Sequence, residues 1–128
     1  MAEESGYTAL VVENEALIAL DISSALSENG FAKVHVASSP EKARAYLNEA
    51  PIHVALVDLH LGHSSDGIEI ARALVERAVP TLFMTGYDHF PEGLPSVLSK
   101  VGRLTKPFSG AQLLQQVAAL LPGGARLG

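Results

Sequence analysis

The stretch Ile52-His53-Val54-Ala55-Leu56-Val57-Asp58 decides the fold that this sequence predicts. It is nearly all apolar and ends in a carboxylate. A strand of this composition is usually buried on both faces, as in a parallel sheet that lies between two layers of helices. Residues 9–12 and 80–84 are two further runs of the same kind. We therefore expect three central strands in one parallel sheet.

Two weaker strand patterns and four helical patterns complete the alternation. Residues 34–37 and 102–105 have the character of edge strands. Helical periodicity lies between the strands, over residues 15–29, from residue 39 onward, over about 67–77 and over 109–121. Ser39-Pro40-Glu41 and Ser109-Gly110-Ala111-Gln112 are typical of helix starts, and Gly30 is typical of a helix stop.

Strands that alternate with helices form right-handed βαβ units. The sequence therefore predicts a flavodoxin-like (βα)5 fold, in which a doubly wound, five-stranded parallel sheet has the order 2-1-3-4-5. We expect a single domain over residues 1–128, with a core over about 7–122. The fourth helix should lie within residues 87–99. Two prolines and a glycine interrupt this segment, so we expect the helix to be short or mobile and to begin near Pro95.

The composition excludes several classes of protein. The 128 residues carry nine Lys and Arg against fourteen Asp and Glu, a net charge of −5, which argues against direct nucleic-acid binding. The chain has no cysteine, so disulfides, thiol chemistry and Cys-ligated zinc are excluded. No apolar run approaches the roughly 20 residues of a membrane span, and the acidic N-terminus is unlike a secretory signal. We expect a cytoplasmic protein with no membrane partner.

Polar side chains follow the expected strands at the points where the strands end. In chain order they are Glu13 and Asn14, Asp58 and His60, Thr85, and Lys106. In sheets of this kind, ligands bind beyond the carboxyl ends of the strands. A set of carboxylate and amide or carbonyl oxygens suits Mg²⁺, and a carboxylate can attack phosphorus to give an aspartyl phosphate.

These residues suggest a division of roles in phosphoryl transfer. Asp58 would be the nucleophile, and Glu13 would hold the metal or its waters. Lys106 would pair with one phosphoryl oxygen and Thr85 would hydrogen-bond another, which neutralises the charge on the transferring group. One such residue at a strand end is weak evidence, but four in order are hard to obtain by chance.

The sequence resembles a response regulator receiver domain of two-component signalling over essentially the whole chain. The matching residues are Glu13, Val57-Asp58-Leu59, Asp66-Gly67, Thr85-Gly86 and Lys106-Pro107-Phe108. The resemblance implies that Asp58 accepts a phosphoryl group from a histidine kinase or a histidine phosphotransfer protein. It also implies a cis Lys106–Pro107 bond and a Mg²⁺ ion bound by Glu13, Asn14, Asp58 and the carbonyl of His60.

The resemblance implies a signalling switch rather than a turnover enzyme, with self-catalysed phosphoryl transfer and hydrolysis only. Phosphorylation would change the surface made by the fourth helix, residues 102–105 and the last helix. That surface would bind a downstream protein, which the sequence does not name, or a second copy of the chain. No output domain follows in this sequence, so the resemblance is to a stand-alone receiver.

The sequence departs from the family's pattern at two positions. Receivers usually have two adjacent acids after the first strand, and the second of them is Asn14 here. An amide brings no charge, so we expect weaker metal binding, for which Glu15 is a candidate to compensate. Most receivers have Tyr or Phe three residues before the lysine, as a rotameric switch, where this chain has Arg103.

The exit of the fourth strand, Phe83-Met84-Thr85-Gly86-Tyr87, resembles a Phe-Ala-Thr-Gly-type subgroup of receivers that lacks the aromatic switch. By this resemblance the switch region comprises Thr85, Gly86, Tyr87, Arg103 and Pro107. We expect activation to order residues 86–99 around Thr85 rather than to flip an aromatic ring.

Two other functions stay open. A degenerate receiver would bind proteins without being phosphorylated, which Asn14 motivates. An enzyme or nucleotide-binding protein of the same fold is the weaker alternative, because the turn Glu13-Asn14-Glu15-Ala16 has no glycine to cradle a phosphate. His60, His63 and Asp66 have a spacing that could bind a transition metal, although a solvated surface loop explains the two histidines better.

Overall fold

The computed structural model describes residues 6–61, 66–86 and 95–121. Its centre is a parallel sheet of five strands in the order β2-β1-β3-β4-β5. The strands are β1 (Tyr7–Val12), β2 (Phe31–Ala37), β3 (Val54–Asp58), β4 (Thr81–Thr85) and β5 (Gly102–Thr105). This confirms the predicted order 2-1-3-4-5 and the prediction that the second and fifth strands form the edges.

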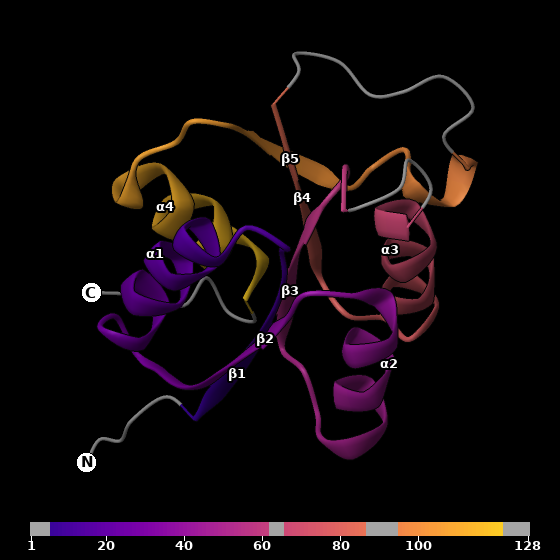
Figure 1. Cartoon of the computed structure of the whole chain (residues 1–128), viewed down its shortest axis with the longest axis horizontal. Coiled ribbons are helices and arrows are strands. Elements are labelled where there is room, and N and C mark those ends of the chain that lie inside the picture. The colour runs from indigo at the N-terminus through magenta and orange to yellow at the C-terminus, as the bar shows by residue number, and fades with distance from the viewer. Residues whose placement is uncertain (1–5, 62–65, 87–94, 122–128) are drawn as a thin grey trace.

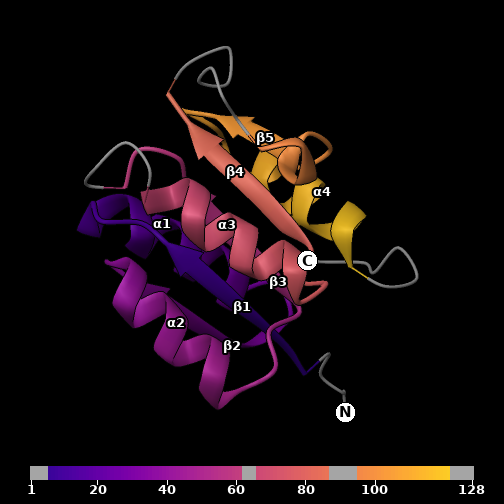
Figure 2. The same ribbon diagram turned by 90° about the vertical axis from the view of Figure 1, so that its right-hand side faces the viewer.

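The helices cover both faces of the sheet. They are α1 (Ala16–Ser27), α2 (Pro40–Glu49), α3 (Asp66–Glu76) and α4 (Gly110–Leu120), with one 3₁₀ turn, η1 (Ser96–Leu98), before β5. In Figure 1 the sheet is seen between α1 and α4 on one side and α2 and α3 on the other. Figure 2 looks onto the face that α2 and α3 cover. The result is the doubly wound, flavodoxin-like arrangement that the alternation of patterns predicts.

The inner positions of the central strands are apolar because each of these strands packs against helices on both sides. Along β3, Val54 and Leu56 join the core cluster under α1 and α4. Ala55 and Val57 join the cluster under α2 and α3. All four side chains have no exposed area. The stretch that decides the fold is therefore buried on both of its faces, as in other parallel sheets.

The predicted helix starts are confirmed. The Ser39 hydroxyl accepts a hydrogen bond from the Lys42 amide and Pro40 is the first residue of α2. At α4 the Ser109 hydroxyl accepts from the Gln112 amide at 3.0 Å, while the Gln112 side chain accepts from the Ser109 amide at 2.8 Å. This reciprocal pair is a capping box, which satisfies two amides of the first turn.

Some boundaries differ from the prediction: β2 begins at Phe31 rather than at Val34, and β3 begins at Val54 rather than at Ile52. Helix α1 ends at Ser27 rather than near residue 29, because the Asn29 amide side chain donates to the Ala25 carbonyl and Gly30 takes a left-handed φ of 103°. The fourth helix, which was expected to be short and to begin near Pro95, is represented in the described residues by the single turn η1, which follows Pro95. Residues 87–94 lie outside the described residues. Within the described ranges, no helix has the length and apolar character of a membrane span.

Candidate functional site

The carboxyl ends of four strands bring the predicted residues to one edge of the sheet, the upper edge in Figure 1. Glu13 directly follows β1, Asp58 ends β3 and Thr85 ends β4. Lys106 directly follows β5, and its amide donates to the Thr85 carbonyl at 2.7 Å. The strand register aligns these ends, since Asp58 pairs with Met84 and Thr85 with Thr105. The structure therefore brings to one edge the four residues that were predicted to meet there, Glu13, Asp58, Thr85 and Lys106.

The Lys106 ammonium joins two buried carboxylates. Its Nζ lies 2.9 Å from Glu13 Oε1 and 3.4 Å from Asp58 Oδ2. The Glu13 side chain is fully buried, while 7% of Asp58 and 18% of Lys106 are exposed. Because charges interact more strongly away from water, this partial burial strengthens both contacts. Lys106 thus places a positive charge between two carboxylates that accept its hydrogen bonds.

Burial and pairing act on these groups in opposite directions. Burial raises the pKa of Glu13 above its ordinary value, against hydrogen bonds from Lys106 and the Glu15 amide that lower it; the Asp58 charge raises it further. Burial lowers the pKa of Lys106, but the hydrogen bond to Glu13 and the charges of Asp58 and Glu13 raise it above its ordinary value overall. Lys106 is therefore a cation at neutral pH, whereas at Glu13 the effect of burial exceeds that of the hydrogen bonds and the pKa stays raised.

The Asp58 carboxylate is held at both oxygens. Oδ1 accepts a hydrogen bond from the His60 amide at 2.9 Å, and Oδ2 faces Lys106. The Leu59 amide donates to the Met84 carbonyl at 3.0 Å, which continues the pairing of β3 with β4 past the end of the strand. These contacts fix the orientation of the carboxyl group that we expect to be the nucleophile.

Gly67 packs directly against the backbone of Asp58 and Leu59, a contact that was not predicted from the sequence. A Cβ atom at Gly67 would lie only 2.3 Å from the Asp58 carbonyl oxygen and about 3.1 Å from that of Leu59. Helix α3 can therefore begin against the end of β3 only if this residue has no side chain. The sequence does place a glycine in the first turn of the predicted helix. Glycine is about 1 kcal/mol less favourable than alanine in a helix, so its presence there indicates that a neighbouring segment packs too closely for a side chain.

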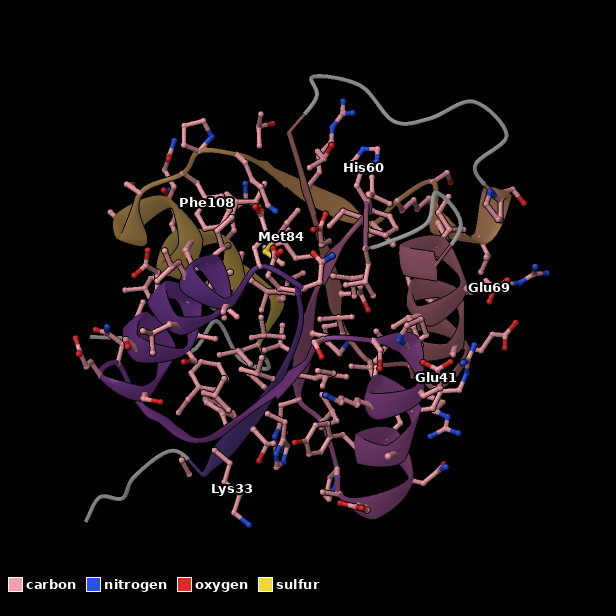
Figure 3. All side chains as sticks on the ribbon, viewed as in Figure 1. Lys33, Glu41, His60, Glu69, Met84 and Phe108 are labelled. Atoms are coloured by element: carbon pink, nitrogen blue, oxygen red, sulfur yellow. The ribbon has the colours of Figure 1, made fainter. Side chains whose placement is uncertain are left out.

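The remaining predicted metal ligands lie at the rim of this group. Asn14 is exposed, and so is His60, the residue whose carbonyl is the predicted ligand; Figure 3 shows His60 at the edge where β3 ends. Among the residues that the structure describes, no three His, Cys, Asp or Glu side chains are placed to bind one ion together. Glu13 and Asp58 do converge on one ammonium. Two carboxylates with water and phosphate oxygens are a common donor set for Mg²⁺, so the residues fit the ion that the resemblance implies.

The switch region is described only in part. Thr85 is fully buried and Gly86 is exposed at the end of β4. Arg103 is exposed on β5 opposite Phe83, and the Lys106–Pro107 peptide bond is cis, as the resemblance implied. Tyr87 and His63 lie outside the described residues, as does the Asp66 side chain, so the suggested transition-metal site with His60 cannot be placed.

A cleft beside the site was not foreseen from the sequence. It has a volume of about 420 Å³ and is lined by Ile18, Asp21 and Ile22 of α1 together with Lys106, Pro107 and Phe108. Figure 3 shows Phe108 beside α1 and α4. Lys106 lines this cleft and also contacts Asp58. A partner that binds along α1 would therefore approach the carboxylate group from this side.

Comparison with known proteins gives consistent matches. The family model described as "Response regulator receiver domain" matches residues 9–118. A response regulator receiver protein of Anaeromyxobacter sp. is 35% identical over 111 residues, which are 85% of this chain and 43% of that protein. The heme response regulator HssR of Staphylococcus saprophyticus is 28% identical over 116 residues, 89% of this chain and 51% of that protein. The chain thus spans about half the length of these curated relatives.

Solved structures show the same fold. The crystal structure of a response regulator receiver protein from Sinorhizobium medicae superposes with a TM-score of 0.76 at 29% sequence identity. The similarity covers 94% of this chain and 98% of that one.

Proposed function

The chain belongs to the response regulator receiver domain family, and from this premise we propose that it is a phosphoaccepting receiver whose phosphorylation site is Asp58. The donor would be the phosphohistidine of a histidine kinase or of a histidine phosphotransfer protein in the cytoplasm. The observation that carries the proposal is the contact of Lys106 with both Glu13 and Asp58 at the carboxyl edge of the sheet. A nucleophile, a fixed cation and a second acid thereby meet at one point.

The proposed transfer step uses groups whose positions are described. An Asp58 carboxylate oxygen forms the new bond to phosphorus, and the phosphorus–nitrogen bond of the donor breaks, with its electron pair going to the imidazole ring. Lys106 Nζ lies 3.4 Å from Asp58 Oδ2. It therefore needs to move little to pair with an oxygen of a phosphoryl group on Asp58. Thr85, at the end of the neighbouring strand, donates its hydroxyl to another phosphoryl oxygen.

Glu13, Asp58 and the carbonyl of His60 would hold the Mg²⁺ ion, with Asn14 at the rim. When bound, the ion neutralises charge on the phosphoryl oxygens. The role of Glu13 follows from its burial, because a fully buried carboxylate with two hydrogen-bond donors is rigidly placed. Self-catalysed hydrolysis of the aspartyl phosphate would reset the switch, so we propose a signalling protein and not a turnover enzyme.

The test is the intact mass of the protein after incubation with Mg²⁺ and acetyl phosphate. We expect the mass to increase by one phosphoryl group, and we expect no increase for Asp58→Asn, which keeps the size of the side chain. Glu28→Gln is the matched control, since Glu28 is an exposed acid at the C-terminal end of α1, and it should be phosphorylated like the unchanged protein. A chain that gains no mass from acetyl phosphate or from a phosphorylated histidine phosphotransfer protein would contradict the proposal.

For the output, we propose that phosphorylation acts on the switch region Thr85, Gly86, Tyr87, Arg103 and Pro107. Position 103 holds an arginine in place of the aromatic residue of most receivers, which supports assignment to the Phe-Ala-Thr-Gly-type subgroup. For this chain we propose that activation orders residues 86–99 around Thr85. The surface of η1, β5 and α4 would then bind an unidentified downstream protein or a second copy of the chain. Val97 supports this assignment, because 47% of this apolar side chain is exposed on η1.

A degenerate receiver is the second candidate, and one observation favours it. Asn14 is uncharged and exposed, and Lys106 already occupies the space between Glu13 and Asp58. Such a protein would bind its partner without Mg²⁺ and without phosphate. Partner binding that survives in Asp58→Asn, together with an absence of Mg²⁺ binding, would favour this candidate.

A further inference from the structure

We propose that Glu15 supplies the carboxylate charge that Asn14 does not, and that it holds the Mg²⁺ ion through one of the ion's water molecules. This inference rests on the proposed function, because it concerns the same metal. It assigns a role to a residue outside the direct ligand set of Glu13, Asp58 and the His60 carbonyl.

The turn after β1 places Glu15 next to Glu13. The Glu15 amide donates a hydrogen bond of 3.1 Å to Glu13 Oε2, while Glu13 Oε1 accepts from Lys106. Glu13 is fully buried and its own amide donates to the Ala37 carbonyl at 3.0 Å. The backbone of Glu15 is therefore hydrogen-bonded to the most buried acid of the site.

The Glu15 side chain is directed to the site instead of to its own helix. Glu15 is the N-cap of α1, a position where a side chain commonly accepts a hydrogen bond from the first turn, yet it makes no such bond. Its Oε1 instead lies 3.9 Å from Lys106 Nζ. The carboxylate thus lies near the same ammonium that Glu13 and Asp58 contact.

The net charge of Lys106 and the acids around it equals that of a divalent cation in magnitude only when Glu15 is included. Three carboxylates lie within 4 Å of one ammonium, which leaves two negative charges when all groups are ionised. Without Glu15 one negative charge would remain, since Asn14 brings none. An added negative charge near the ion increases its affinity, most strongly at low ionic strength.

The exposure of Glu15 indicates contact through water. Its side chain is 66% exposed, against 7% for Asp58, and it is the acid of this group that solvent reaches most freely. No three acidic or histidine side chains of the described residues are placed to bind one ion directly. Mg²⁺ usually keeps several of its waters when bound to protein, so a carboxylate in this position can accept a hydrogen bond from such a water.

The experiment measures Mg²⁺ binding by isothermal titration calorimetry at low salt, without any phosphodonor. We expect Glu15→Gln to weaken Mg²⁺ binding about three- to tenfold, because one negative charge near the divalent ion is lost. Glu28→Gln is the control: Glu28 is an exposed acid at the other end of α1, and its loss should change the affinity less than twofold. An effect of Glu15→Gln no larger than that of Glu28→Gln would overturn the proposal.

A second pair of variants tests the exchange of roles between positions 14 and 15. Asn14→Asp should strengthen Mg²⁺ binding, and in that background Glu15→Gln should have a smaller effect than in the unchanged protein, since the charge is then supplied at position 14. Equal effects in both backgrounds would show that Glu15 does not compensate for Asn14. Glu13→Gln separates the two proposals. If Glu13→Gln abolishes Mg²⁺ binding while Glu15→Gln leaves the affinity unchanged, the receiver function is supported and the role of Glu15 is contradicted. If the unchanged protein binds no Mg²⁺, both proposals are contradicted.

Discussion

Lys106 donates a 2.9 Å hydrogen bond to Glu13, which lies 93 positions earlier in the chain. The contact joins the end of β5 to the end of β1, although β3 and β4 lie between these strands in the sheet. Asp58, at the end of β3, lies 3.4 Å from the same ammonium. The state of Glu13 and the position of the expected nucleophile therefore depend on one lysine side chain.

Replacing Lys106 with Met should make the stability of the protein depend strongly on pH. Without the ammonium, burial and the Asp58 charge remain, and both raise the pKa of Glu13. The native state would then bind a proton that the unfolded chain releases, so stability falls as the pH rises through the raised pKa of Glu13. We expect the free energy of unfolding of Lys106→Met, measured in urea without Mg²⁺, to decrease by about 1–3 kcal/mol between pH 5 and pH 8.

The double variant Lys106→Met, Glu13→Gln is the control for this effect. It has no titrating group at position 13, so its stability should change much less over the same pH interval. The free energy of unfolding of Lys106→Met should change more between pH 5 and pH 8 than that of the double variant. Equal changes in the two variants would show that Glu13 is not the group responsible.

Gly67→Ala should disturb the site through the backbone of Asp58. The new Cβ would lie 2.3 Å from the Asp58 carbonyl oxygen, so α3 or the end of β3 has to move. We expect a loss of about 1–3 kcal/mol in stability, as for other overpacked sites, and slower phosphorylation by acetyl phosphate at pH and temperature where the variant is folded. The measurements are urea unfolding and the time course of the mass increase.

Gly110→Ala is the matched comparison, because Gly110 is also in the first turn of a helix and a Cβ there meets no atom within 4 Å. This variant should be as stable as the unchanged protein or gain up to about 1 kcal/mol, with the same rate of phosphorylation. Similar behaviour of the two alanine variants would contradict a role for Gly67 in positioning Asp58.

Leu98 should be the anchor of η1, the single turn that precedes β5. It is fully buried, and it packs in the core cluster of α3 and the central strands. Leu98→Ala should therefore lower the free energy of unfolding by about 2–4 kcal/mol. Val97→Ala should change it by less than about 1 kcal/mol, since that neighbour is 47% exposed. Equal losses for the two variants, measured by urea unfolding, would show that η1 is not held by Leu98.

The strand order and most of the site could be predicted because they depend on patterns with a physical period. The continuous apolar run of β3 indicated burial on both faces, and a parallel sheet brings all carboxyl ends to one edge. The positions of Glu13, Asp58, Thr85 and Lys106 follow from that topology alone.

The contacts within the site could not be predicted in the same way, because they depend on side-chain geometry. No pattern indicates that Lys106 lies nearer to Glu13 than to Asp58, or that the Glu15 amide donates to Glu13. The end of α1 was misjudged by two residues because the Asn29 side chain takes the Ala25 carbonyl. The fourth helix was expected to be short, and the described residues hold one turn of it, because residues 95–99 supply one strongly buried side chain, Leu98, to anchor a helical segment.

Binding of a phosphoryl mimic should change the environment of β4 and η1 together. With Mg²⁺ and beryllofluoride, we expect the amide NMR signals of Thr85, Gly86 and Ser96–Leu98 to shift, while those of the distant edge strand β2 stay. The reason is that Thr85 is fully buried at the end of β4, and its carbonyl accepts from the Lys106 amide at 2.7 Å. A movement of its hydroxyl toward the mimic would thus displace the end of β4 and Gly86, the last described residue before Pro95 and η1. Thr85→Ala should keep the shift at Leu59 and His60, which reports binding, and lose the shift at η1. If η1 still responds in that variant, the signal reaches it by another route.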